Sequence, residues 1–195
     1  MRNRLSALLI LAVFCGIYFG KMMVQRSHGI RTDQMGSRKE KKLHRVEMLM
    51  KTTTLAIVPV QLLSIVTGWN VLPESVRCAG AVIGFLGDGI FLAAVVCMKD
   101  SWRAGIPDQD KTEIVTNGIY RISRNPAFLG FDLMYVGIFL MYGNPLTGAF
   151  TLFAVIMLHL QILQEEIYLD EMFGEVYRNY KKHVRRYLGK RREKG

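Results

Sequence analysis

The 195-residue chain lacks charged side chains over three long stretches, and these gaps exclude an ordinary soluble domain. No Asp, Glu, Lys or Arg occurs from Leu5 to Gly20, from Thr52 to Pro73 or from Leu133 to Gln164. A helix needs about 20 apolar residues to cross the hydrocarbon core of a bilayer. The last gap is longer than one such helix requires. The composition therefore predicts a membrane protein that crosses the bilayer several times.

Other absences narrow the classes of chemistry. The three cysteines (Cys15, Cys78 and Cys97) lie in apolar stretches, and their odd number argues against a disulfide framework. The four histidines are scattered without metal-ligand spacing, so we expect no metal site. No glycine-rich loop of the phosphate-binding or dinucleotide-binding type is present.

The hydropathy pattern predicts a single all-α membrane domain over residues 1–195, a helical bundle with five transmembrane helices. The expected spans are residues 5–24, 52–72, 76–98, 126–142 and 146–164. Gly143-Asn144-Pro145 divides the longest uncharged stretch and indicates a tight hairpin between the last two spans. The first span begins like a signal peptide, but its long apolar core has no small-x-small cleavage motif after it. We expect a retained helix there.

Basic residues predict the orientation in the membrane. The net charge is +10, and 22 of the 26 Lys and Arg residues lie within residues 25–51, within 99–125 or after 164. Five spans place these segments on one side, which the positive-inside rule assigns to the cytoplasm, with the N-terminus outside. The compact size favours a prokaryotic inner membrane. Because the basic residues follow membrane boundaries, we expect anionic headgroups rather than nucleic acid to face them.

The C-terminal segment carries an amphipathic pattern. Apolar residues recur every three or four positions from Leu169 to Tyr187, with Lys and Arg between them. This spacing predicts a C-terminal amphipathic helix that lies at the cytoplasmic interface or caps the bundle.

Polar residues gather just before the fourth span. Asn125-Pro126 is typical of a helix start, where the Asn side chain accepts from free backbone N–H groups and Pro fits the first position. Arg121 and Arg124 precede this start, and a helix N-terminus carries partial positive charge. Together these groups favour binding of a carboxylate or a phosphate.

A carboxylate pair, Glu165-Glu166, ends the fifth span. Because spans four and five form a hairpin, this pair should lie beside Asn125. Cationic groups and carboxylates then share one pocket at the membrane surface. Such a pocket suits a zwitterion, for example an amino acid group.

One ordered set of residues carries a family resemblance. The set is Gly118-Ile-Tyr120-Arg-x-x-Arg124-Asn125-Pro126-x-x-x-Gly130, Glu165-Glu166, Phe173-Gly174, Tyr177-x-x-Tyr180 and Val184-x-Arg186. It resembles the isoprenylcysteine carboxyl methyltransferase and phospholipid N-methyltransferase family of integral membrane enzymes. That family more often has His where this chain has Asn125, and the departure leaves the acceptor open.

The resemblance implies S-adenosylmethionine-dependent methyl transfer to a lipid or lipid-like acceptor at the cytoplasmic face, with S-adenosylhomocysteine as product. The acceptor is either a prenylcysteine carboxylate, which needs no base, or a phospholipid amine, which does. The cofactor half spans about residues 99–188. The predicted cofactor-binding residues are Gly118, Tyr120, Arg121, Arg124, Asn125, Pro126, Gly130, His159, Glu165 and Glu166. The predicted catalytic residues are Arg124, Glu165 and Glu166, and either glutamate or a substrate phosphate is a candidate base.

Four further residues are candidates for acceptor binding: Asp88, Asp132, Trp102 and Arg103. Asp88 lies within the third span, where a carboxylate marks either function or close helix packing between its flanking glycines. Trp102-Arg103 is either a headgroup contact or an interfacial anchor.

Two other functions stay open. One is an NADPH-dependent sterol-type reductase, because those enzymes carry an Arg-x-x-Tyr-x-Gly stretch near the C-terminus that is similar to part of this ordered set. The other is a small non-enzymatic transporter or scaffold. The carboxylate pair argues against the reductase. A single central carboxylate without an internal repeat argues against the transporter.

Overall fold

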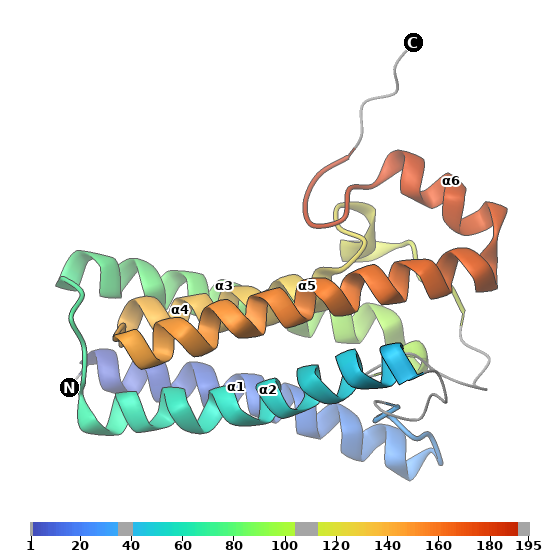
Figure 1. Cartoon of the computed structure of the whole chain (residues 1–195). Coiled ribbons are helices and arrows are strands. Elements are labelled where there is room, and N and C mark those ends of the chain that lie inside the picture. Colours follow the sequence, from blue (N-terminus) through green and yellow to red (C-terminus); the bar gives the residue numbers. More distant parts are fainter. Residues whose placement is uncertain (1, 35–40, 104–112, 191–195) are drawn as a thin grey trace.

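The computed structural model describes residues 2–34, 41–103 and 113–190, and this part of the chain is helical without a β-strand. Its elements are α1 (Arg2–Ser27), α2 (Lys41–Thr67), α3 (Glu74–Met98), η1 (Lys99–Ser101), η2 (Gly118–Arg121), α4 (Pro126–Met141), α5 (Pro145–Phe173) and α6 (Glu175–His183). Five long helices run antiparallel in one bundle, and α6 stands beside one end of it (Figure 1). Residues 104–112 of the predicted cofactor half lie outside the described residues, as do the basic residues Arg38, Lys39, Lys111, Arg191, Arg192 and Lys194.

Four of the described helices are long and apolar enough to cross a membrane: α1, α2, α3 and α5. The structure thus confirms the all-α class, and it shows several helices that are long and apolar enough to cross a membrane. The predicted fourth span, α4, has 16 residues, about 24 Å at the rise of an α-helix. It is shorter than the hydrocarbon core of about 30 Å, so five transmembrane helices are not confirmed by length.

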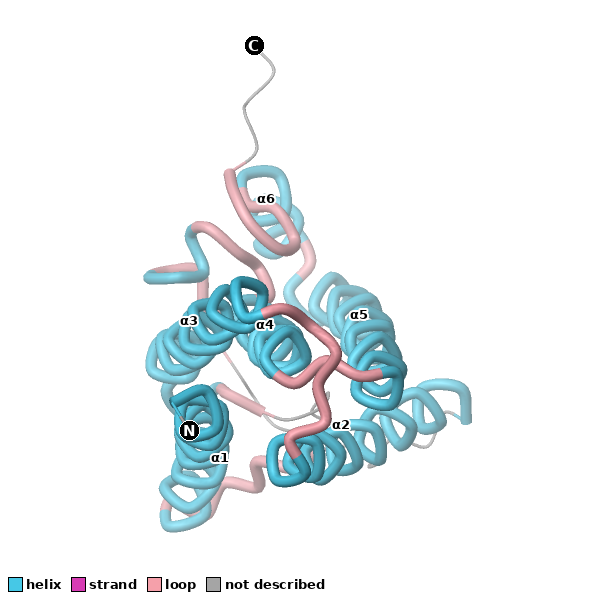
Figure 2. The backbone as a smooth tube through the Cα atoms, turned by 90° about the vertical axis from the view of Figure 1, so that its left-hand side faces the viewer, coloured by secondary structure: helices cyan, strands magenta, loops and turns pink. Residues whose placement is uncertain are grey.

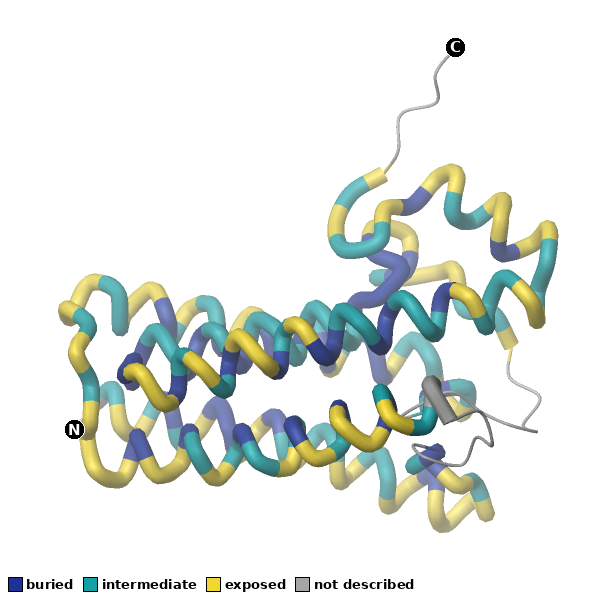
Figure 3. The backbone as a smooth tube through the Cα atoms, viewed as in Figure 1, coloured by how far each residue is buried: buried dark blue, intermediate teal, exposed yellow. Residues whose placement is uncertain are grey.

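The position of α4 explains why it can be short. It lies in the middle of the bundle, between α3 and α5, with α1 and α2 on its other side (Figure 2). Every residue from Ser123 to Asn144 is buried or half-buried, whereas exposed positions recur along the outer helices (Figure 3). Protein therefore surrounds α4 over its whole length.

Glycines bring α3 and α4 into backbone contact. A Cβ atom added to Gly137 would lie 2.5 Å from the backbone nitrogen of Gly84, and one added to Gly87 would lie 2.6 Å from that of Met134. Only glycine allows helices to approach so closely. Of the two glycines predicted to pack helices beside Asp88, Gly87 does so, whereas Gly89 faces open space.

The predicted hairpin between the last two spans is confirmed. α4 ends at Met141 and α5 begins at Pro145. The Asn144 side chain accepts from Thr147 N at 3.0 Å and donates to Ser64 Oγ at 3.0 Å, which also ties the hairpin to α2.

Helix ends differ most from prediction at the other end of the bundle. α2 begins at Lys41 rather than at residue 52, and α5 continues to Phe173 rather than stopping at residue 164. Helices that leave the hydrocarbon need not end there, because charged Lys and Glu are good helix formers in water. Glu165 and Glu166 therefore lie inside α5.

The prediction of one amphipathic helix across residues 169–187 was wrong. Gly174, at φ +50°, separates α5 from the nine-residue α6. Glycine adopts this left-handed backbone without a steric penalty, so it ends the helix. After α6, residues 184–190 form an extended turn closed by a bridge between Val184 and Lys190. We refer to residues 184–190 as the C-terminal strap.

We predict that Gly137→Leu destabilises the protein, because the new side chain would push α4 away from α3. Overpacking of this kind costs about 1–3 kcal/mol or more. The matched control is Gly89→Leu, at a glycine with open space around its Cβ position. Thermal unfolding in detergent should show a lower Tm for Gly137→Leu only. Equal Tm values for the two variants would contradict the close contact.

Candidate functional site

The C-terminal strap is bound to the start of α4 through main-chain hydrogen bonds. Arg124 N donates to Arg185 O at 3.1 Å, and Gly189 N donates to Ile122 O at 2.7 Å. These bonds join segments that are about sixty residues apart in the sequence. The strap therefore fixes the loop that carries Arg124.

A buried ion-pair centre lies beneath the strap. Glu166 Oε1 accepts from Arg124 Nη2 at 2.7 Å, and Glu166 Oε2 accepts from Arg186 Nη2 at 2.8 Å. The side chains of Arg124 and Glu166 are only 4% and 6% exposed. Asn125 Nδ2 donates to Glu166 Oε1 at 3.3 Å and to Arg186 O at 3.2 Å. Asn125 does not cap α4 with its side chain, which corrects the prediction made from the Asn-Pro pair.

Arg186 belongs to this centre but was not among the predicted site residues. Its hydrogen bond to Glu166 and the attraction of that carboxylate raise the pKa of Arg186 above its ordinary value, so it remains a cation. The sequence contained a signal, since Val184-x-Arg186 was part of the family resemblance. Spacing alone gave no reason to bring residue 186 back to α5.

A small cavity of about 130 Å³, here called the end cavity, lies between η2, the start of α4, the end of α5 and α6. Its lining residues are Met98, Ser101, Trp102, Arg103, Glu113, Ile114, Val115, Tyr120, Arg124, Asn125, Ala127, Phe128, Glu165, Tyr168, Leu169, Phe173, Tyr177 and Tyr180. Six predicted site residues are therefore brought together here: Trp102, Arg103, Tyr120, Arg124, Asn125 and Glu165. The aromatic residues of α5 and α6 were not predicted as site residues.

Two residues that line the end cavity, Arg124 and Tyr177, carry hydrogen-bond donors without a partner in the described part of the chain. Arg124 Nε and Nη1 and the Tyr177 hydroxyl are buried and have no hydrogen-bond partner among the described residues. Burial raises the pKa of Tyr177, so its hydroxyl stays protonated and can donate. Buried donors are nearly always satisfied in native proteins, so this set fits an anionic group of a ligand.

Glu165 and Glu166 have separate environments. Successive helix residues point about 100° apart, and only Glu165 lines the cavity. Glu165 Oε1 accepts from Gln161 Nε2 at 3.3 Å, whereas Glu166 is held by the two arginines. The structure therefore corrects the expectation of a carboxylate pair sharing one pocket.

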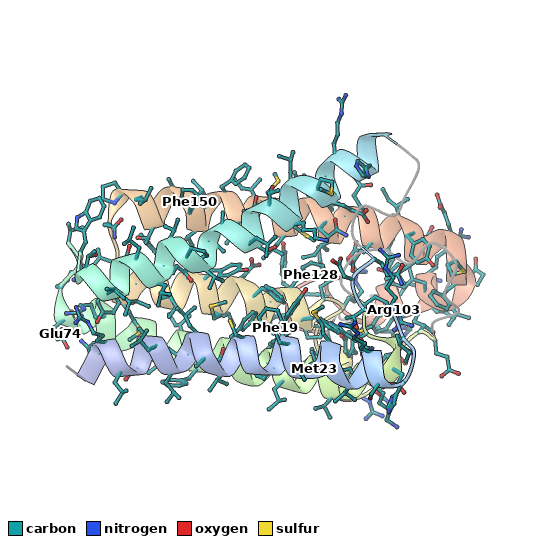
Figure 4. All side chains as sticks on the ribbon, turned by 90° about the horizontal axis from the view of Figure 1, so that it is seen from below. Phe19, Met23, Glu74, Arg103, Phe128 and Phe150 are labelled. Atoms are coloured by element: carbon teal, nitrogen blue, oxygen red, sulfur yellow. The ribbon has the colours of Figure 1, made fainter. Side chains whose placement is uncertain are left out.

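A larger groove adjoins the end cavity. Its volume is about 380 Å³, and its lining residues are Phe14, Cys15, Tyr18, Phe19, Met50, Thr54, Leu55, Val58, Pro59, Trp102, Arg103, Ala127, Phe128, Phe131, Tyr135, Leu158 and Glu165. Phe19 and Leu55, which are 56% and 65% exposed, place its mouth on the outer surface at α1 and α2. Figure 4 shows Phe128 between these two helices, with Arg103 nearer the end of the bundle.

The end cavity and the groove share five lining residues: Trp102, Arg103, Ala127, Phe128 and Glu165. This junction is held rigidly, because buried Gln25 donates to Trp102 O at 2.8 Å and accepts from Thr32 Oγ1. Together the two volumes reach the range of small-molecule sites, roughly 300–1,000 Å³.

Six of the predicted cofactor residues, Glu166 and His159 among them, lie outside the lining of both cavities. Gly118 begins η2, and a Cβ atom added to it would clash with the Cys97 side chain. Arg121 is exposed. Pro126 is the buried first residue of α4, and Gly130 packs against α3. These residues shape the loop and the bundle around the site.

Like His159, two of the predicted acceptor residues, Asp88 and Asp132, lie outside both linings. His159 Nδ1 hydrogen-bonds the Tyr187 hydroxyl of the strap. Asp88 is buried, and neither of its carboxylate oxygens has a partner among the described residues. One oxygen of half-buried Asp132 is likewise without a partner there.

Sequence comparison identifies the family. Residues 78–176, half of the chain, match the sequence model of the family described as phospholipid methyltransferase. The chain belongs to this family. The predicted family resemblance is thus confirmed, and the match covers η2, α4, α5 and the junction between the cavities.

Named relatives of the chain are isoprenylcysteine O-methyltransferases. The chain is 35% identical over 112 residues to a probable protein-S-isoprenylcysteine O-methyltransferase of Oryza sativa subsp. indica, covering 56% of this chain and 59% of that protein. It is 30% identical over 110 residues to protein-S-isoprenylcysteine O-methyltransferase A of Arabidopsis thaliana (54% and 55%). The Schizosaccharomyces pombe enzyme is 36% identical over 109 residues (53% and 46%). The alignments thus span about half the length of these relatives.

We predict that Glu166→Ala destabilises the protein far more than Glu165→Ala. Removing Glu166 leaves the buried Arg124 cation uncompensated and the half-exposed Arg186 without its partner, and an uncompensated buried charge costs about 3–5 kcal/mol. Glu165 has one long hydrogen bond to lose. Chemical denaturation of both variants in detergent measures the difference. An equal loss of stability would show that the ion-pair centre does not hold this end of the bundle together.

Proposed function

We propose that the chain is an S-adenosylmethionine-dependent methyltransferase, with the cofactor in the end cavity and a lipid-like acceptor in the groove. The buried, unpartnered donors of Arg124 and Tyr177, two residues of the cavity that Glu165 also lines, carry this proposal. Membership of the phospholipid methyltransferase family and the names of the relatives support it. They lend no support to the reductase, transporter and scaffold alternatives.

The end cavity fits the amino acid part of the cofactor. Arg124 Nε and Nη1 and the Tyr177 hydroxyl donate to its carboxylate, and Glu165 accepts from its ammonium group. Glu166 holds the third nitrogen of Arg124, so the two remaining donors have a fixed direction. Aromatic rings such as Tyr120 and Phe173 supply faces for a base and a sulfonium cation.

S-adenosylmethionine, when bound, supplies an electrophilic methyl group on its sulfonium sulfur. The residues at the junction then have three tasks: to orient the acceptor, to align it with the methyl group and to exclude water. Trp102 and Phe128 line this junction, and the hydrogen bond from Gln25 fixes the Trp102 backbone.

The acceptor that fits best carries a carboxylate. Of the two charged residues at the junction, Glu165 is assigned to the cofactor's ammonium group, which leaves Arg103 to face the acceptor. A cation there repels an ammonium group and attracts an anion. An ionised carboxylate needs no base, and the relatives are named isoprenylcysteine O-methyltransferases. We therefore favour a lipid-linked carboxylate over a phospholipid amine.

We further propose that α4 is a fifth crossing enclosed by the other helices, with the N-terminus outside and the C-terminus in the cytoplasm. The described ends that carry the basic segments all lie at the α6 end of the bundle (Figure 1). The site then faces the cytoplasm. A prokaryotic inner membrane stays a prediction from size, since the relatives named above are eukaryotic.

Calorimetric titration with S-adenosylhomocysteine tests the cofactor site. Glu165→Gln should raise its Kd about 10- to 100-fold through loss of a charge-assisted hydrogen bond. Tyr177→Phe should raise it about 2- to 10-fold. Tyr142→Phe, at the far end of the bundle, should bind like the wild type. Unchanged affinity in both cavity variants would remove the cofactor from this cavity.

A groove-filling variant separates acceptor binding from cofactor binding. Val58→Trp should raise KM for a farnesylcysteine acceptor while leaving the Kd for S-adenosylhomocysteine unchanged, because Val58 lines only the groove. The control is Val82→Trp on the outer face of α3, where Val82 is 69% exposed. The same KM in both variants would place the acceptor elsewhere.

The proposed topology predicts that tags at Met1 and Gly195 lie on opposite sides of the membrane. Protease protection in sealed, oriented vesicles reads this directly. Tags on the same side would mean an even number of crossings and would contradict the proposal that α4 is a fifth one.

A further inference from the structure

The C-terminal strap lies alongside the uncharged stretch of α5. Tyr187 of the strap hydrogen-bonds His159, which lies inside the uncharged stretch of α5. His159 is seven residues before Glu166, which is about 10 Å along a helix. The strap therefore extends past the ion-pair centre toward the apolar part of the bundle.

Two apolar side chains are exposed on the strap and on the loop that it binds. Leu188 is 56% exposed and Ile122 is 45% exposed. They belong to one surface, because Gly189 N donates to Ile122 O at 2.7 Å. Apolar side chains exposed at this depth suit the boundary between headgroups and acyl chains.

Three exposed cations flank these apolar residues: Arg121, Arg185 and Lys190. Arg121 precedes Ile122, and Arg185 N donates to Gly189 O at 2.9 Å. None of the three has an ion-pair partner among the described residues, in contrast to Arg178, which pairs with Asp170 on α5. The surface thus combines apolar contact with uncompensated positive charge.

We propose that this surface, the strap face (Arg121, Ile122, Arg185, Leu188 and Lys190), docks on anionic phospholipid headgroups in the leaflet at that end of the bundle. Each cation near an anionic leaflet is attracted to its negative surface potential, and the apolar pair enters the interface. The docked strap stays closed over Glu166, because its main chain binds Arg124 and its Arg186 binds Glu166. Anionic lipid therefore stabilises the closed site.

Hydrogen–deuterium exchange of the full chain in lipid nanodiscs tests the docking without reference to activity. The readout is exchange at the amides of Arg124 and Gly189, whose hydrogen bonds join the strap to the loop before α4. Nanodiscs of phosphatidylcholine alone are compared with nanodiscs of equal parts phosphatidylcholine and phosphatidylglycerol. Exchange should be about tenfold slower in the anionic nanodiscs. Equal rates in the two lipids would overturn the proposal.

A charge-matched pair of variants identifies the face. Arg121→Gln/Lys190→Gln should lose most of the lipid effect. Arg178→Gln/Lys182→Gln removes the same charge from α6, where these residues contact Asp170 and Asn179, and should keep the effect. Equal loss in both double variants would assign the effect to overall charge and overturn the strap face as the docking surface.

The consequence for the site rests on the proposed function and has its own measurement. In the wild type, the Kd for S-adenosylhomocysteine should fall several-fold in the anionic nanodiscs, and Arg121→Gln/Lys190→Gln should lose this change. Slower exchange without any cofactor binding would overturn the proposed function and leave the docking intact. Cofactor binding with lipid-independent exchange would overturn the docking alone.

Discussion

The buried carboxylate of Glu166 is the constraint on which this end of the molecule depends. A lone charge is costly inside an apolar bundle, so it must be paired and hydrogen-bonded. Arg124, Asn125 and Arg186 meet this need from the start of α4 and from the C-terminal strap. One ion-pair centre thus closes the chain over its own site and fixes the direction of the Arg124 donors.

The central helix α4 determines where the end cavity and the groove meet. Backbone contact at Gly84 and Gly137 draws it against α3, so four longer helices can surround it. Its first turn then lies at the point where the end cavity meets the groove. Ala127 and Phe128 belong to both linings for this reason. A water-soluble cofactor and an apolar acceptor can meet at such a place without either leaving its preferred surroundings.

Sequence reasoning succeeded where a local signal or a simple topological rule decided the outcome. Gly143-Asn144-Pro145 marks a tight turn, and that turn brings Asn125 beside the glutamates of α5. The prediction was wrong where the first charged residue after an apolar stretch was taken as the end of the helix, as at Glu165. α5 continues through Glu165 and Glu166 to Phe173, because a helix persists in water when its residues favour it.

The sequence by itself determined the all-α membrane class, the family and six of the residues that line the end cavity, since apolar run length and motif spacing are local properties. Only the tertiary structure decided which of two adjacent glutamates faces the cavity and which holds the arginines. That division follows from the 100° rotation between successive helix residues and from what packs on each side. Only the tertiary structure also revealed the role of Arg186, because a strap that returns to α5 leaves no periodic pattern in the sequence.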